Sequence, residues 1–182
     1  MEKKYRLLED DAIIVDGRTL NRIEALRDFA DVKKGDKGGY IESEINLSHE
    51  GNCWVSGSAC VYDNAWVYGN ARVYGDAWVY GNARVYGDAW VSGDACVYGD
   101  AWVYDNARVY GNAQVYDNAR VFGIARVFGI ARVYDNAQVY DNAWVYDNAQ
   151  VYDNAWVSGN ARVSGNVLVS GNAKVSEGNI RS

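Results

Sequence analysis

A six-residue repeat is the sequence feature that most limits what this chain can fold into. Twenty consecutive hexads such as VYGNAR, VYDNAW and VYGDAW run from Val55 to Lys174 without one insertion, and the imperfect HEGNCW before them keeps the phase. A period of six matches neither the roughly 3.6 residues per turn of an α-helix nor the roughly 3.5 of a coiled coil, so a helix would scatter valine and alanine around every side. The repeat therefore excludes a helical fold.

Each hexad instead predicts a short strand followed by a tight corner. With valine as position one, Ala, the variable residue at position six, Val and Tyr form a strand with Ala and Val on one side. Gly-Asn, Gly-Asp or Asp-Asn at positions three and four tolerate the left-handed backbone of a corner. Three hexads complete a triangular coil of 18 residues around a Val/Ala core, so the 21 hexads predict about seven stacked coils with parallel sheets as faces. A right-handed solenoid with less regular coils is the alternative.

Residues 1–48 contain no hexad and read as a cap. Tyr5 to Leu8, Ala12 to Val15 and Leu20 to Leu26 are expected as short strands, with Asp16-Gly17 as a turn. The segment RIEALRDF has a helical turn as its alternative. A solenoid exposes strand edges and an open apolar core at its ends, so it needs a cap. We expect a β-rich cap over residues 1–48 and the repeat solenoid over residues 49–182.

A family resemblance rests on motifs in and after the cap. They are Asp28-Phe29, Asp31-Val32-Lys33, Gly35, Gly38-Gly39-Tyr40-Ile41, Asn46-Leu47-Ser48 and Gly51-Asn52-Cys53-Trp54. These segments resemble the entry segment of bacterial YdcK-like hexapeptide-repeat proteins. The resemblance implies an all-β, left-handed parallel β-helix, and the hand of the coil enters only through it. It implies no established reaction, and this chain departs from the pattern in its purer repeats without intervening loops.

The chain offers few residues for catalysis. Acyl transfer on this type of coil needs a general base, usually histidine, together with a projecting loop, and a zinc carbonic anhydrase needs three histidines. The sequence has 1 histidine, His49, at an inward position of the first hexad, where it reads as a boundary residue beneath the cap. We expect no enzyme and no cofactor, with an acyltransferase-like protein as the remote alternative.

The three cysteines predict no disulfide. Cys53 lies at an inward position and reads as a core residue. Cys60 and Cys96 lie at outward positions of one face, two coils and about 9.6 Å apart, which exceeds disulfide reach. Both are expected as free surface thiols.

A column of corner carboxylates is a weak candidate for a metal site. Asp117, Asp135 and Asp153 occupy position three on successive coils of one corner, at a spacing of about 4.8 Å. A bound cation such as Ca²⁺ would relieve their repulsion. The favoured alternative is that the carboxylates splay into water and support the bend.

Aromatic residues concentrate on the outside of the predicted coil. All 7 Trp lie at position six and 13 of the 15 Tyr at position two, both outward positions. Alternation of Trp and Arg at one-coil spacing places a guanidinium against an indole, a cation–π contact worth ~0.5–1 kcal/mol. Such faces are typical of binding surfaces, and a purely stiffening role is the alternative. The candidate binding face consists of Trp66, Arg84, Trp102, Arg120, Trp156, Tyr68, Tyr86 and Tyr104.

Two hexads break the polar pattern together. The repeats VFGIAR at Val121 and Val127 replace Tyr by Phe and the corner residue by Ile, so that Phe122, Ile124, Phe128 and Ile130 form an apolar band on one coil. Because this change has no folding advantage, we expect homo-oligomerisation through the band, as a dimer, with neutral drift as the alternative. A carbohydrate or polymer that stacks on the rings is the alternative partner.

Charge and hydropathy limit the remaining partners. The net charge is −6, and the repeats carry 13 acidic against 9 basic residues, which argues against nucleic-acid binding. No stretch reaches about 18 consecutive apolar residues, so no membrane is expected. The first residues lack the apolar region of a signal peptide, and we expect a cytoplasmic protein.

Overall fold

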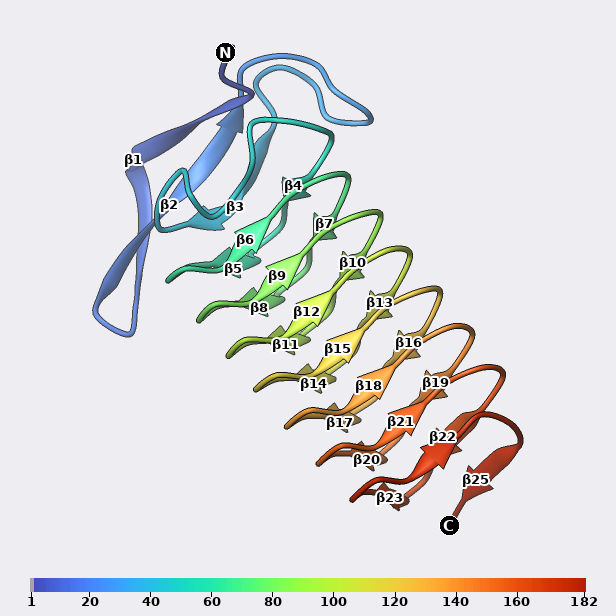
Figure 1. The fold of residues 1–182 in the computed structure, drawn as a ribbon. Coiled ribbons are helices and arrows are strands. Elements are labelled where there is room, and N and C mark those ends of the chain that lie inside the picture. The colour runs from blue at the N-terminus through green and yellow to red at the C-terminus, as the bar shows by residue number, and fades with distance from the viewer. Residues whose placement is uncertain (1) are drawn as a thin grey trace.

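The structure, a computed structural model that describes residues 2–182, is a parallel β-solenoid of about eight turns (Figure 1). The described residues form strands and turns, with no helix among them. Each hexad pairs with the hexad 18 residues later, as where Trp90 lies opposite Arg108 and Val91 opposite Val109. Three hexads therefore complete one circuit, which confirms the predicted triangular coil. Within residues 2–182 no helix is long and apolar enough to span a lipid bilayer.

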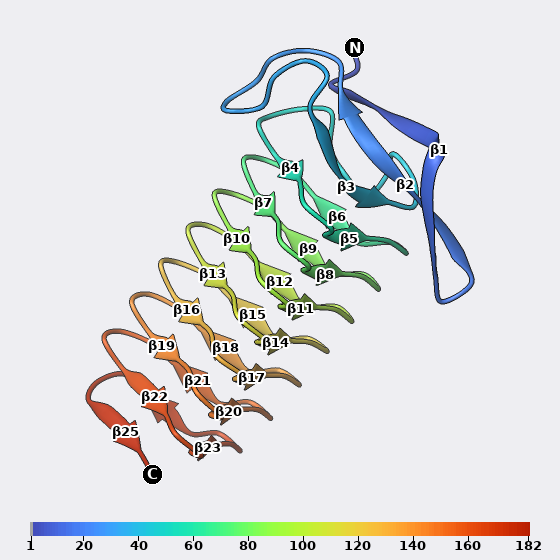
Figure 2. The same cartoon turned by 180° about the vertical axis from the view of Figure 1, so that it is seen from behind.

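Three sheets form the sides of the solenoid (Figure 2). Sheet 1 contains, in spatial order, β1 (Tyr5–Val15), β2 (Arg18–Ala25), β3 (Lys37–Ile41), β5 (Cys60–Val61), β8 (Trp78–Val79), β11 (Cys96–Val97), β14 (Gln114–Val115), β17 (Arg132–Val133), β20 (Gln150–Val151) and β23 (Leu168–Val169). Sheet 2 contains β4 (Trp54–Val55), β7 (Arg72–Val73), β10 (Trp90–Val91), β13 (Arg108–Val109), β16 (Arg126–Val127), β19 (Trp144–Val145), β22 (Arg162–Ser164) and β25 (Asn179–Arg181). Sheet 3 contains β6 (Trp66–Val67), β9 (Arg84–Val85), β12 (Trp102–Val103), β15 (Arg120–Val121), β18 (Gln138–Val139), β21 (Trp156–Val157) and β24 (Lys174–Val175).

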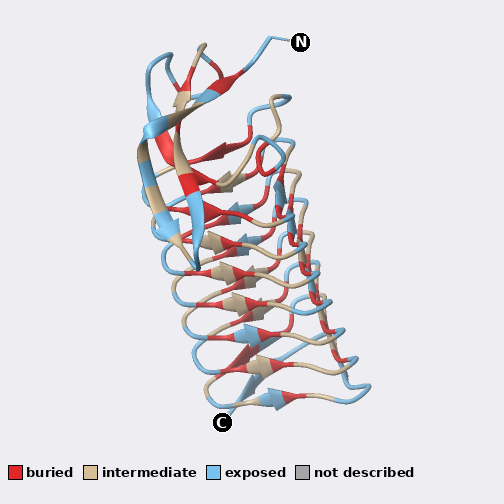
Figure 3. Cartoon of the chain, turned by 90° about the vertical axis from the view of Figure 1, so that its left-hand side faces the viewer, coloured by how far each residue is buried: buried red, intermediate tan, exposed pale blue. Residues whose placement is uncertain are grey.

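The core consists of the valines and alanines of the hexads. From Ala59 to Val163, every valine at position one and every alanine at position five is fully buried, as Figure 3 shows in red along the coils. The strands are shorter than predicted, because only positions six and one have strand geometry. The flanking residues still bond between coils: the Ser92 N–H donates to the Val109 carbonyl at 3.0 Å.

The corners use a left-handed backbone, as predicted. Position three has a positive φ whether it is glycine, as at Gly123 (φ 70), or aspartate, as at Asp141 (φ 57). Aspartate adds a link between coils, since the Asp141 carboxylate accepts the Gly159 N–H at 3.2 Å. We name the corners by the sheets they join: the 3–2 corner carries Ile124, the 2–1 corner carries Ile130 and the 1–3 corner carries Asp135.

The N-terminal segment begins with an antiparallel hairpin. β1 is one strand with a register shift between Leu8 and Ala12, where the sequence predicts two strands, and it turns at Asp16-Gly17 into β2. The segment RIEALRDF is a strand up to Ala25, so its helical alternative is wrong. β3, which the sequence does not predict, pairs with β2 and then in parallel with β5, which joins the cap to sheet 1.

Two glycines let β3 approach the first coil. A Cβ atom on Gly38 would lie 2.6 Å from the Val55 carbonyl oxygen, and one on Gly39 would lie 2.5 Å from that of Ala59. No side chain fits at those distances. The Gly38-Gly39 pair is thus a docking element between cap and solenoid.

Candidate binding faces of the solenoid

His49 lies beneath the cap, at the boundary position predicted for it. Its ring stacks on Tyr5 with a centroid distance of 4.3 Å, and its Nδ1 accepts the Lys4 backbone N–H at 3.2 Å. Its Nε2 lies 3.5 Å from Glu44 Oε2, and 18% of the side chain is exposed. These contacts fasten the N-terminal residues to the start of the solenoid.

A buried lysine contacts the inward cysteine of the first hexad. Lys4 Nζ donates to the Cys53 carbonyl at 2.8 Å and to its Sγ at 3.2 Å. Burial raises the pKa of the Cys53 thiol and lowers the pKa of the Lys4 amine from its usual 10.5. Cys53 is therefore a core residue, as the sequence predicts.

The prediction of two surface thiols is wrong for Cys60. All three cysteines are free, but Cys60 is only 2% exposed, whereas Cys96 is half-buried. Leu20 and Tyr40 of the cap pack against Cys60, together with Tyr62 at position two of the next hexad. The hairpin thus covers the outer side of sheet 1 over the first coils.

Two of the corner carboxylates accept hydrogen bonds from backbone N–H groups of the next coil. Asp135 accepts the Asp153 N–H at 3.3 Å, and Asp153 accepts the Gly171 N–H at 2.9 Å. In the part of the chain from residue 2 to 182, no group of three or more His, Cys, Asp and Glu side chains is placed to hold a metal ion. Asp135 and Asp153 thus link successive coils of this corner through backbone N–H groups. A cation at the column of Asp117, Asp135 and Asp153 stays an untested prediction.

The tyrosines of sheets 1 and 3 form unbroken ring stacks, which we call ladders. The sheet 1 ladder runs from Tyr62 to Tyr152 with centroid distances of 4.8–5.0 Å and interplanar angles of 1–6°. The sheet 3 ladder runs from Tyr68 to Tyr140 at 4.7–5.0 Å. Because each ring covers the face of its neighbour, a ladder offers ring edges to a ligand. Binding of a carbohydrate or polymer stays a prediction, which a glycan array tests.

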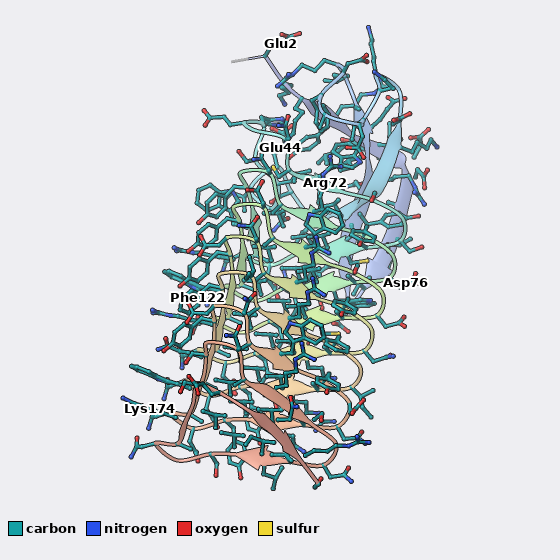
Figure 4. All side chains as sticks on the ribbon, turned by 90° about the vertical axis from the view of Figure 1, so that its right-hand side faces the viewer. Glu2, Glu44, Arg72, Asp76, Phe122 and Lys174 are labelled. Atoms are coloured by element: carbon teal, nitrogen blue, oxygen red, sulfur yellow. The ribbon has the colours of Figure 1, made fainter. Side chains whose placement is uncertain are left out.

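Cations and indoles alternate beside the sheet 3 ladder, as predicted, with Gln138 as the one interruption. Arg84 and Arg120 lie on the two sides of Trp102, at 5.1 and 5.0 Å from its ring. At the C-terminal end of the same face, Lys174 lies 4.4 Å from Trp156, and Figure 4 labels Lys174 and Phe122 on this side of the molecule. The candidate binding face of sheet 3 is therefore brought together as one continuous surface.

The tryptophan nearest the cap is an exception to the outward placement. Trp54 occupies position six, yet it is only 3% exposed. Tyr5 and Phe29 pack edge-on against it, with centroid distances of 6.4 and 5.3 Å. Outward positions of the first coil are thus buried by the cap.

The apolar band lies around sheet 2. Ile124 on the 3–2 corner is 50% exposed and Ile130 on the 2–1 corner is 54% exposed. Phe128 lies between them on sheet 2, stacked at 4.9 Å between Tyr110 and Tyr146. Phe122 belongs to the sheet 3 ladder, 4.9 Å from Tyr104. The two phenylalanines thus replace tyrosines within ladders, and the isoleucines alone add exposed aliphatic surface.

Sheet 2 contains a feature that the sequence reasoning missed. Ser92 replaces the ring of one hexad, VSGDAC, so its ladder is interrupted between Tyr74 and Tyr110. A cavity of about 200 Å³ opens there, lined by Tyr74, Trp90, Ser92, Arg108, Tyr110 and Arg126. The other serines at position two lie at the ends of ladders, so the signal was a serine with rings one coil before and after it.

A known family of repeat proteins has a sequence model that matches most of the hexads. The family model described as "YdcK Beta solenoid repeat" matches residues 65–81, 77–93, 101–115, 113–129, 131–147, 137–152, 149–164, 155–171 and 161–177, more than half of the chain. The chain belongs to the YdcK β-solenoid repeat family. This membership confirms the resemblance seen in the sequence, while the left-handed winding stays a prediction.

This YdcK-family chain is similar to a curated protein whose name suggests an activity. The chain is 42% identical over 60 residues to a protein of Escherichia coli (strain K12) named "Uncharacterized acetyltransferase YdcK". The match covers 29% of this chain and 18% of that protein. The name applies to that relative, of which this chain matches less than one fifth.

Proposed function

We propose that this YdcK-family solenoid is a non-enzymatic binding module that dimerises through the apolar band at Ile124 and Ile130. The observation that carries the proposal is the exposure of these two side chains, 50% and 54%, on one coil. Other coils place Asn or Asp at these corner positions, as at Asn106 and Asn142, apart from Ser58. Burying an exposed isoleucine stabilises an interface by up to ~1.5–3 kcal/mol.

The position of the isoleucines fits a partner that lies across sheet 2. Ile124 and Ile130 lie on the two corners that flank this sheet, with Phe128 between them. The hexads follow one another without insertion, so no loop rises between the corners. A second copy across this face contacts both isoleucines at once, as a self-complementary interface requires.

The double variant Ile124→Asn, Ile130→Asn tests the proposal. We expect size-exclusion chromatography with light scattering to give twice the 20.2 kDa of one chain for the original protein, and 20.2 kDa for the variant. Asparagine suits these corners: Asn142 Nδ2 already donates to Asn160 Oδ1 at 3.3 Å, so the variant should fold.

The matched control is Leu168→Asn, which removes an aliphatic side chain of similar exposure, 59%, from sheet 1. This control should keep the mass of the original protein. An unchanged mass in the double variant, or a monomeric original protein, contradicts dimerisation through the band.

An acetyltransferase is the second candidate, and the name of the Escherichia coli relative favours it. Against it, His49 is stacked on Tyr5 and accepts the Lys4 N–H, which leaves it poorly placed as a general base. Incubation with acetyl-CoA and a panel of amines and alcohols tests this candidate. We expect no release of free CoA above the rate without protein, and release that His49→Gln abolishes would overturn the non-enzymatic proposal.

A further inference from the structure

The interrupted ladder of sheet 2 leaves two aromatic ring faces without a stacking partner. In this ladder, Tyr110, Phe128 and Tyr146 follow each other at 4.9 Å. Tyr74 lies two coils before Tyr110, with Ser92 between them in sequence register. Two coil spacings make about 10 Å. The gap therefore has room for one planar ring in the register of the ladder.

The walls of the gap are arranged for a ring that enters from outside. Ser92, 9% exposed, forms its floor, and Trp90 stands beside it, edge-on to Tyr74 at a centroid distance of 6.0 Å. Tyr74 and Trp90 are 37% and 40% exposed, which makes them among the most open aromatic side chains of the molecule. A volume of about 200 Å³ holds one planar ring system, and the remainder of a larger ligand lies outside the gap.

Two arginines give this gap a positive charge. Arg108 and Arg126 lie side by side on neighbouring strands of sheet 2 and both line the cavity. Within residues 2–182, neither forms an ion pair with a carboxylate. The Arg108 guanidinium lies 4.8 Å from the Trp90 ring, and the Arg126 guanidinium lies 4.9 Å from the Trp144 ring. Paired guanidiniums without a counter-charge are typical of sites for carboxylate or phosphate.

We propose that the gap between Tyr74 and Tyr110 binds a small planar aromatic molecule bearing an anionic group. The ring takes the place of the missing aromatic side chain at Ser92, stacked between the two tyrosines, and its phosphate or carboxylate contacts Arg108 and Arg126. A nucleoside monophosphate and an aromatic acid share this chemistry. Ring stacking between Tyr74 and Tyr110 does not require dimerisation. The gap nevertheless opens on sheet 2, the face that the proposed dimer covers, and Arg126 lies on the same coil as Ile124 and Ile130.

Isothermal titration calorimetry with defined probes tests the site. The probes are AMP and 4-hydroxybenzoate, which carry a ring and an anion, and adenosine and ribose 5-phosphate, which each lack one of the two. We expect AMP or 4-hydroxybenzoate to bind one-to-one. The probe with the higher affinity shows whether the site takes a nucleoside monophosphate or an aromatic acid. Adenosine and ribose 5-phosphate should each bind at least about tenfold more weakly, since each loses either the charged contact or the stacking.

Ser92→Tyr is the decisive variant, because it fills the gap with the ring that other coils carry. It should raise the melting temperature and weaken binding of the better probe by at least about tenfold, since the ligand's place is occupied. Ser158→Tyr is the matched control: it adds a ring after Tyr140 at the end of the sheet 3 ladder and should leave binding unchanged. Arg108→Gln should weaken binding and reduce its dependence on salt.

The proposal is overturned if neither AMP nor 4-hydroxybenzoate binds, or if the better probe binds Ser92→Tyr as tightly as it binds the original protein. The titration is repeated on the Ile124→Asn, Ile130→Asn variant. Unchanged binding there supports the ligand site even if dimerisation fails, and loss of binding there shows that the gap depends on the interface and contradicts the site as proposed.

Discussion

In most hexads, position two holds an aromatic ring that stacks on the rings one coil before and one coil after it. Phe122 stacks at 4.9 Å between Tyr104 and Tyr140, so the ladder requires the ring and not the hydroxyl. Stacking removes water from the phenols. This desolvation, with the charge of neighbouring tyrosines adding to it, raises the pKa of Tyr86 and Tyr116 from the usual 10.0 to about 12.

These shifted residues predict a loss of stability at alkaline pH. The unfolded chain releases the tyrosine protons near pH 10.0, whereas the folded chain holds them up to about 12. Stability should therefore be complete below pH 10 and fall as the pH rises toward 12. Urea unfolding, followed by circular dichroism at each pH, measures this loss.

The variant Tyr86→Phe, Tyr116→Phe is the control, since it keeps the stacking and removes the titrating groups. It should retain more of its neutral-pH stability than the original protein does above pH 10. Equal losses in the two proteins would show that Tyr86 and Tyr116 are not the cause.

Among the elements, the cap departs most from what the sequence indicates. The hexad pattern places Cys60 and Tyr62 outward, and they are outward of the Val/Ala core. The β1–β2 hairpin then folds over sheet 1, where Arg18 pairs with Glu42 and Asp63, and buries them. A contact between segments so far apart in sequence leaves no local signal in the sequence. The burial of Cys60 therefore could not be predicted from its hexad.

Cysteine reactivity tests how the cap lies on the solenoid. Burial raises the pKa of Cys60 to about 11, and the cap blocks its thiol, so iodoacetamide at neutral pH should modify Cys96 and leave Cys60 and Cys53 intact. In Gly39→Ala the new methyl group collides with the first coil, and Cys60 should become reactive.

Tandem mass spectrometry of tryptic peptides locates the label, because Cys53 and Cys60 lie in one peptide between Lys37 and Arg72. Cys96 serves as the internal reference in both proteins. If Cys60 reacts as fast as Cys96 before the glycine is replaced, the hairpin does not cover sheet 1. If Gly39→Ala leaves Cys60 protected, the glycine pair is not the docking element.

For the whole molecule, the sequence predicts the solenoid well because one period sets everything that repeats. A six-residue unit with Val and Ala two positions apart defines the core, and three units per circuit then define every strand neighbour. Two additions outside the hexads account for about eight turns rather than seven. β3 and Leu47 begin the first coil on sheets 1 and 3, and the C-terminal strand β25 ends the last coil on sheet 2. The gap at Ser92 could not be recognised from one hexad alone, because it exists only where rings lie two coils apart.

The number of hexads in one circuit is the central claim, and one distance measures it. Asn70 and Asn160 lie on the same 3–2 corner, five coils apart, and both are exposed. Spin labels on cysteines at these two positions, in a Cys96→Ser background diluted with unlabelled protein, should give an electron–electron distance near 24 Å, at about 4.8 Å for each coil. A distance near 36 Å, as about two hexads per circuit would produce, or a broad distribution without a defined peak, would contradict the triangular solenoid.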